Sequence, residues 1–170
     1  MENSSKKPIL FVDVDGVVSL FGFSSIEDAP GAFHWIDGVA HCIGAESGRL
    51  LRQVLDRFEL VWATGWEEKA NEYLLFLLEL PGEELPTLTF DGRAAFGSAH
   101  WKIDAIDEFA ADRPAAWIDD NLDEECAEWA QGRHAPTLLI QTDSAVGITD
   151  EHVERLLEWA DEVAAGAPSA

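Results

Sequence analysis

Two carboxylates, Asp13 and Asp15, follow a short apolar run and are separated by a single residue. Side chains at positions i and i+2 of an extended chain point to the same side, so both carboxylates can face one centre. Such oxygen ligands suit Mg2+, which prefers one or two carboxylates together with water and substrate phosphate. One carboxylate can also attack phosphorus and form an aspartyl-phosphate. Taken alone, such a pair is more often two solvated loop aspartates, so it needs support from elsewhere in the chain.

Two further polar residues could act on a phosphate group. Thr64 follows a second apolar run, and its hydroxyl, together with the backbone N–H of Gly65, could bind a phosphoryl oxygen. A turn or a helix cap is the alternative interpretation of Thr64. Lys102 could neutralise a phosphoryl group and its nucleophile. A surface lysine is the alternative there, although lysine is scarce in this chain, which contains only Lys6, Lys7, Lys69 and Lys102.

A second pair of carboxylates, Asp119 and Asp120, ends the apolar run 115–118. Adjacent acids at the end of a buried strand repel each other unless a cation compensates their charge. The alternative is an acidic helix N-terminus, in which Asp119 or Asn121 acts as the cap. The Asp-Asp pair therefore indicates either a metal site or a helix start.

The elements that would position these residues can be read from the hydrophobic pattern. Apolar runs predict buried strands at 9–12, 60–63, 115–118 and 137–140, with a shorter one at 88–90. Helical spacing predicts helices over 47–58, 67–80, 101–111 and 122–131, and a last helix capped by Thr149. This alternation predicts an α/β fold, a Rossmann-like three-layer sandwich with a mostly parallel five-stranded sheet. Ligands of such sheets bind beyond the carboxyl ends of the strands, where Asp13, Thr64 and Asp119 lie.

Length and composition narrow the class of protein. The 170 residues suit one domain, 1–170, with residues 17–45 as a loop or small hairpin flap. The formal net charge of -22 works against nonspecific nucleic-acid binding and draws divalent cations to carboxylate clusters, although much of it is expected to be solvated acidic surface. Cys42 and Cys126 form no CxxC pair, which favours the reducing cytoplasm. The apolar stretches are too short for a membrane span, and the N-terminus lacks the apolar region of a signal peptide.

The order of the motifs along the chain is more specific than any one of them. It resembles the four motifs of the haloacid dehalogenase-like (HAD) superfamily, over most of the chain from Ile9 to the last helix. The motifs are Asp13-Val14-Asp15-Gly16, Thr64-Gly65 after a strand, Lys102, and an apolar strand that runs into Asp119-Asp120.

This resemblance implies a phosphatase mechanism with a role for each residue. Asp13 would be the nucleophile and Asp15 the general acid/base, while Thr64 and Lys102 would hold the phosphoryl group. The second aspartate favours phosphoryl transfer over dehalogenation, because HAD enzymes that cleave carbon–halogen bonds do not carry it. The expected substrate is a phosphomonoester.

The resemblance also implies Mg2+ as cofactor. Asp120 aligns with the metal-binding Asp of the family's apolar-apolar-Gly-Asp pattern and would bind Mg2+ together with Asp13. Asp119 replaces the glycine of that pattern, as in members with a double Asp, and counts as a further metal candidate. Asp15 would give the metal its backbone carbonyl.

A narrower resemblance links the chain to small capless HAD proteins of actinobacterial type. It rests on Val61-Trp62-Ala63-Thr64-Gly65-Trp66 with Ala70-Asn71 downstream, on Trp117-Ile118-Asp119-Asp120, and on Gly147-Ile148-Thr149. Some of these relatives are grouped with HAD domains associated with RNA repair, a link that the net charge disfavours for this chain alone. The segment 17–45 is too short for a full cap domain, so the site should be open.

Two points remain alternatives at this stage. Trp66 could stack on a leaving group at the open site, or it could be a core residue. The function could be that of a phosphatase, of a phosphotransferase that passes the phosphoryl group to another acceptor, or of a catalytically weak binding or regulatory protein. A binding protein has no need for both Asp13 and Asp15, which favours an enzyme.

Overall fold

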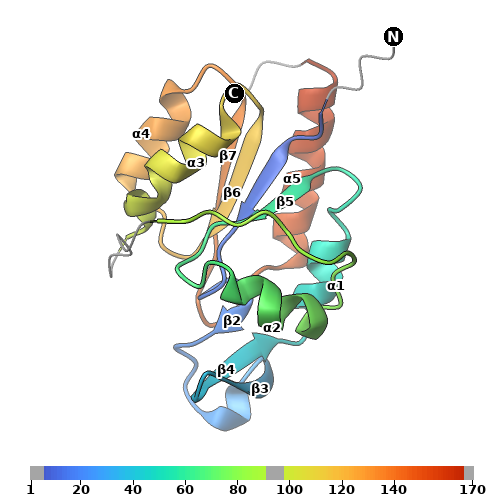
Figure 1. The fold of residues 1–170 in the computed structure, drawn as a ribbon, viewed down its shortest axis with the longest axis vertical. Coiled ribbons are helices and arrows are strands. Elements are labelled where there is room, and N and C mark those ends of the chain that lie inside the picture. Colours follow the sequence, from blue (N-terminus) through green and yellow to red (C-terminus); the bar gives the residue numbers. More distant parts are fainter. Residues whose placement is uncertain (1–5, 91–97, 167–170) are drawn as a thin grey trace.

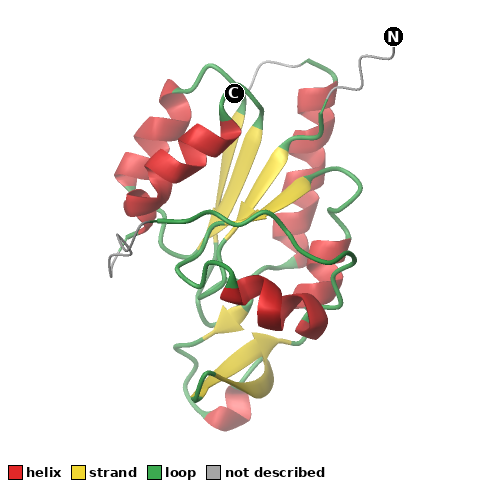
Figure 2. Cartoon of the chain, in the orientation of Figure 1, coloured by secondary structure: helices red, strands yellow, loops and turns green. Residues whose placement is uncertain are grey.

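The main sheet has four parallel strands and carries the polar strand ends. In the computed structural model, which describes residues 6–90 and 98–166, the spatial order of this sheet is β5-β1-β6-β7 (Figures 1 and 2). Its strands are β1 (Ile9–Val12), β5 (Glu59–Trp62), β6 (Ala115–Asp119) and β7 (Thr137–Gln141). All their carboxyl ends lie at one edge, because every neighbouring pair in the sheet is parallel.

Helices cover both faces of this sheet, which confirms the predicted three-layer α/β architecture. In β1, Leu10 and Val12 pack into one hydrophobic cluster, while Ile9 and Phe11 pack into the other. A strand buried on both faces needs such a continuous apolar run. The helices are α1 (Ser47–Arg52), α2 (Lys69–Leu77) and α5 (Asp150–Ala164) in the first cluster, and α3 (Ile103–Ala110) and α4 (Glu124–Gly132) in the second.

The flap segment forms a small antiparallel sheet beyond the carboxyl ends of the main strands (Figure 1). Its order is β2-β4-β3, and its elements are β2 (Ser19–Leu20), the 3₁₀ helix η1 (Ile26–Asp28), β3 (Gly31–Ile36) and β4 (Val39–Gly44). At the β3–β4 turn, Asp37 accepts hydrogen bonds from Lys69 Nζ at 2.5 Å and from the Tyr73 hydroxyl at 2.9 Å. The flap is therefore attached to α2, and it is far smaller than a cap domain.

The predicted fifth strand at 88–90 is wrong. The chain runs parallel to β5 there for one bridge only, between Trp62 and Thr87. Trp62 donates its N–H to the Pro86 carbonyl at 2.9 Å, and Leu88 donates to the Trp62 carbonyl at 3.0 Å. The ladder cannot extend backwards, because Pro86 has no N–H to donate.

The helices were placed correctly, but several boundaries differ. The helix predicted over 47–58 ends at Arg52 and continues as a series of turns, and the one predicted over 101–111 begins as the 3₁₀ helix η2 (Ala99–Lys102). Asp123, not Asp119 or Asn121, caps α4. The predicted cap of α5 is confirmed, since Thr149 forms a capping box with His152. Within residues 6–90 and 98–166, no helix has the length and apolarity needed to cross a membrane.

Candidate active site

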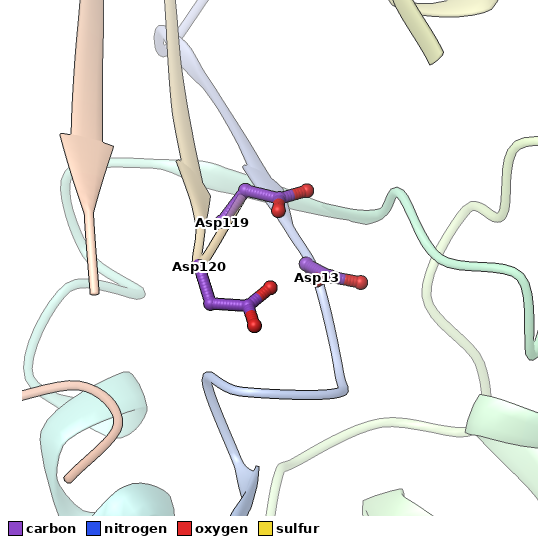
Figure 3. Close-up of side chains that lie close together, drawn as sticks. All are labelled: Asp13, Asp119 and Asp120. Carbon is purple, nitrogen blue, oxygen red and sulfur yellow. The ribbon is translucent and has the colours of Figure 1, made fainter. Parts of the chain in front are cut away.

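Three carboxylates meet where β1 and β6 end. Asp13 directly follows β1, Asp119 is the last residue of β6, and Asp120 comes next. The two strands are held in register there by a hydrogen bond from Asp13 N–H to the Ile118 carbonyl, 3.1 Å long. One oxygen from each carboxylate lies within 4.8 Å of one from each of the others (Figure 3). This is the edge where the sequence predicted a site.

Lys102 neutralises part of this charge from the end of η2. Its Nζ lies 3.0 Å from Asp13 Oδ1 and 2.6 Å from Asp119 Oδ2. The three residues are 4%, 6% and 1% exposed, respectively, so they form a buried ionic group rather than a surface pair. Burial alone would lower the pKa of Lys102, but Asp13 and Asp119 outweigh it and raise that pKa. The two carboxylates therefore favour the charged form of the lysine.

The surroundings of Asp13 and Asp120 disfavour their charged forms. Burial raises the pKa of Asp13 well above its ordinary value, Lys102 opposes this, and Asp119 adds to it. Burial, together with the charge of Asp119, raises the pKa of Asp120 to about 6. A bound cation would relieve both costs, because it stabilises the carboxylate form.

The donor set fits Mg2+. It consists of carboxylate oxygens only, which hard divalent cations prefer. Both oxygens of Asp119 have protein partners, since Oδ2 binds Lys102 and Oδ1 accepts the N–H of Asn121 at 3.0 Å. Asp13 and Asp120 therefore have more free acceptor positions for an ion than Asp119, although all three could contribute an oxygen.

Gly16 leaves the space that Asp120 occupies. Its φ is +81°, and a Cβ on it would lie 2.3 Å from the Asp120 carboxylate. The loop is braced from the end of β7, where the Thr142 hydroxyl donates to the Gly16 carbonyl at 2.7 Å and the Gln141 amide donates to the Asp120 carbonyl. The sequence reasoning missed these two supports. The polar Gln-Thr pair at the end of a predicted strand was the signal that could have found them.

Asp15 lies beside the second strand end, where Trp66 contacts it directly. The indole Nε1 of Trp66 donates a hydrogen bond of 3.1 Å to Asp15 Oδ2, and the backbone N–H of Trp66 donates to Thr64 Oγ1 at 3.2 Å. The surrounding protein raises the pKa of the Asp15 carboxyl, and the Trp66 hydrogen bond partly offsets this. Trp66 thus contacts the predicted acid/base, a contact that neither alternative from the sequence had named.

Thr64 and Gly65 reach the same edge of the sheet through strand pairing. Ala63, just before Thr64, donates its N–H to the Val12 carbonyl at 2.8 Å, which carries the pairing of β1 and β5 past their last residues and brings Thr64 to the same edge as Asp13. Thr64 is buried and Gly65 is exposed. Asn71, quoted above for the narrower resemblance, serves the fold: its side chain bonds Leu85 and the Trp62 indole.

Comparison with known proteins decides the family. A family model described as "HAD domain in Swiss Army Knife RNA repair proteins" matches residues 9–153. The chain belongs to this HAD family. The family is part of a superfamily of HAD-fold phosphatases and phosphotransferases, so its members are of the hydrolase or phosphotransferase type.

Solved structures agree on the fold of this HAD domain. The HAD domain of the effector protein Lem4 from Legionella pneumophila superposes with a TM-score of 0.58 at 14% identity, covering 91% of this chain and 96% of that one. An inactive mutant of the same domain gives a TM-score of 0.59 at 14% identity, covering 94% and 97%. At this identity the likeness concerns the fold alone. No curated protein matches the chain.

Proposed function

We propose that this HAD domain is a Mg2+-dependent phosphatase that hydrolyses phosphomonoesters through an aspartyl-phosphate on Asp13. The observation that supports this most directly is the buried group in which Lys102 lies between Asp13 and Asp119. A lysine held against a carboxylate can bind the phosphoryl group and the nucleophile together. A protein that only binds a ligand would have no use for this arrangement beside a second acid, Asp15.

The proposed reaction has two steps. Asp13 attacks phosphorus as the bond to the leaving oxygen breaks, and Asp15 gives its proton to that oxygen. The Asp15 carboxylate then takes a proton from water, which attacks phosphorus and breaks the bond to Asp13. Lys102 and the groups at Thr64 hold the non-bridging oxygens throughout. The first step requires Asp15 to be protonated at the start.

The cofactor in this proposal is Mg2+, held by Asp13 and Asp120, with Asp119 fixing Lys102 and Asp15 offering its backbone carbonyl. The ion would orient the phosphoryl group and neutralise the charge that develops on its oxygens.

The proposed substrate binds at an open site, which sets few limits on its size. The flap is only a small sheet, so the site can admit a bulky ester, with Gly65 and Trp66 at its edge as the proposed contacts to the leaving group. The matched family's description names RNA repair, so a phosphorylated oligonucleotide belongs in the substrate panel, although a net charge of -22 disfavours it. Cys42 and Cys126 are free and buried, which is compatible with the proposed cytoplasmic location.

The test is hydrolysis of 4-nitrophenyl phosphate with Mg2+ and with EDTA. We expect turnover that EDTA abolishes and that Asp13→Asn lowers to background, while Asp104→Asn, an equal charge change at an exposed position on α3, retains it. Full activity in Asp13→Asn would refute the assignment of the nucleophile.

The same assay distinguishes the alternatives. If added alcohols compete with water for the phosphoryl group, the phosphotransferase interpretation gains. If no ester of a broad panel is cleaved, the interpretation as a binding protein gains.

A further inference from the structure

We propose that Trp66 positions the Asp15 carboxyl for proton transfer to the leaving group, and that the flap holds Trp66 in place. This role rests on the proposed phosphatase function. It differs from a platform for the leaving group, because it acts through the indole N–H on Asp15 rather than through the ring on the substrate.

The contact between the two side chains suits such a role. An indole N–H is a donor only, so its partner must be an acceptor, and here that partner is Asp15 Oδ2 at 3.1 Å. Among the described residues, no other side chain donates to the Asp15 carboxylate. With Oδ2 held by Trp66, Oδ1 is the oxygen left to exchange a proton with the substrate. One hydrogen bond therefore fixes the direction of the carboxyl group.

Asp15 needs this support because of its place in the chain. It lies beyond the end of β1 and precedes Gly16, whose φ is +81°, and its side chain is exposed to solvent. An exposed aspartate at such a turn can occupy several rotamers. Misplacing a catalytic group by about 1 Å can cost about a hundredfold in rate. A donor fixed at the right distance removes that freedom.

Trp66 is itself fixed at two points. Its backbone N–H donates to Thr64 Oγ1, which ties it to the end of β5. Its ring meets the ring of His41 edge to face, with centroids 4.7 Å apart and planes at 63°. His41 lies on β4, and its Nδ1 is 3.0 Å from the hydroxyl of Ser19 on β2. Two strands of the flap thus hold the ring that orients Asp15, so the flap would serve catalysis without covering the site as a cap does.

The test is the dependence of kcat/KM on the leaving group in a series of substituted phenyl phosphates, from 4-nitrophenyl to 4-methylphenyl. These esters share a shape, but the poorer leaving group depends more on protonation by Asp15. We expect Trp66→Phe, which keeps a ring and loses the N–H, to lower kcat/KM about tenfold or more for the 4-methylphenyl ester and less than about threefold for the 4-nitrophenyl ester, part of the 10²–10⁴ typical of general acid catalysis.

Trp129→Phe is the matched control. It also removes an indole hydrogen bond to a carboxylate, Asp107 Oδ1 at 2.9 Å, but away from the site, and it should leave the dependence unchanged. An equal loss for every ester in Trp66→Phe, or no loss, would overturn the positioning role alone. If His41→Ala leaves the dependence of kcat/KM on the leaving group unchanged, the claim that the flap holds Trp66 in place is wrong. A wild-type protein that cleaves none of the series would overturn the proposed function and this role with it.

Discussion

Replacing Lys102 by Met should destabilise the protein by far more than the loss of an ordinary lysine. Lys102 is 4% exposed and is the counter-charge of two buried carboxylates, Asp13 at 3.0 Å and Asp119 at 2.6 Å. Met has a similar length and no charge. Its introduction leaves both carboxylates buried without a cation, which either forces them to take up protons or keeps their charges at a high cost.

The size of the effect follows from the burial. Breaking a buried ion pair by removing one partner costs about 3–5 kcal/mol. In a chain of this size each kcal/mol lowers Tm by roughly 2–4 °C, so a loss of about 10 °C is expected in metal-free buffer. The loss should shrink as the pH is lowered, because protonated carboxyl groups need no counter-charge.

Thermal unfolding in EDTA, followed by circular dichroism at pH 8 and pH 5, measures this loss. Lys69→Met is the control. Lys69 also binds a carboxylate, Asp37 Oδ2 at 2.5 Å, but the two side chains are 61% and 46% exposed. Such exposed pairs contribute at most about 1 kcal/mol.

A Lys102→Met variant no less stable than Lys69→Met would refute the view of Lys102 as the buried counter-ion of the site. If Lys102→Met does not fold, the double variant with Asp119→Asn decides, since it removes one of the two uncompensated charges. We expect it to fold and to regain part of the lost stability. Failure of the double variant to improve on the single one would contradict the argument equally.

Two further predictions concern the metal and the pH response. Mg2+ should raise the Tm of the wild type, because it binds the folded state. Asp120→Asn should lose most of that rise, while the exposed Asp104→Asn should keep it. Differential scanning fluorimetry over a Mg2+ titration checks this, and an unchanged rise in Asp120→Asn would exclude Asp120 as a ligand. His100 Nδ1 lies 2.8 Å from Asp123 Oδ2, which raises the pKa of His100 above 6.5, with Glu125 adding to it. Because the folded state binds this proton more tightly, the stabilisation is complete below pH 6.5 and is lost as the pH rises through the raised pKa. The Tm difference between wild type and His100→Asn should therefore be largest near pH 5.5 and small at pH 8.5, and a difference independent of pH would contradict this.

Much of the architecture is predictable because hydrophobic pattern and strand position are local properties. Continuous apolar runs predicted β1, β5, β6 and β7, because a strand covered on both faces carries mostly apolar side chains along its length. The fifth strand failed for a reason beyond the pattern. Leu88 and Phe90 are buried as an apolar run should be, but the backbone there pairs with β5 at one bridge only, between Trp62 and Thr87, and residues 88–90 form no ladder.

The candidate site was predictable only as a set of strand ends. Lys102 does not belong to that set, since it lies on η2, and its place in the motif order came from the family resemblance rather than from geometry. The sequence carries no signal for His41, because a lone histidine in a flap has no spacing pattern. Its contact with Trp66 joins β4 of the flap to the segment after β5, and only the tertiary structure brings the two together.

The sequence by itself determined which residues share an edge. Parallel strands end on the same side, so Asp13, Thr64 and Asp119 had to come together once the apolar runs became strands. Tertiary structure alone decided which side chains touch: Lys102 bonds Asp13 and Asp119, and Trp66 bonds Asp15. The physical reason is that side-chain contacts depend on how segments far apart in the chain are placed relative to each other, whereas hydrophobic periodicity reports only the face on which each residue lies.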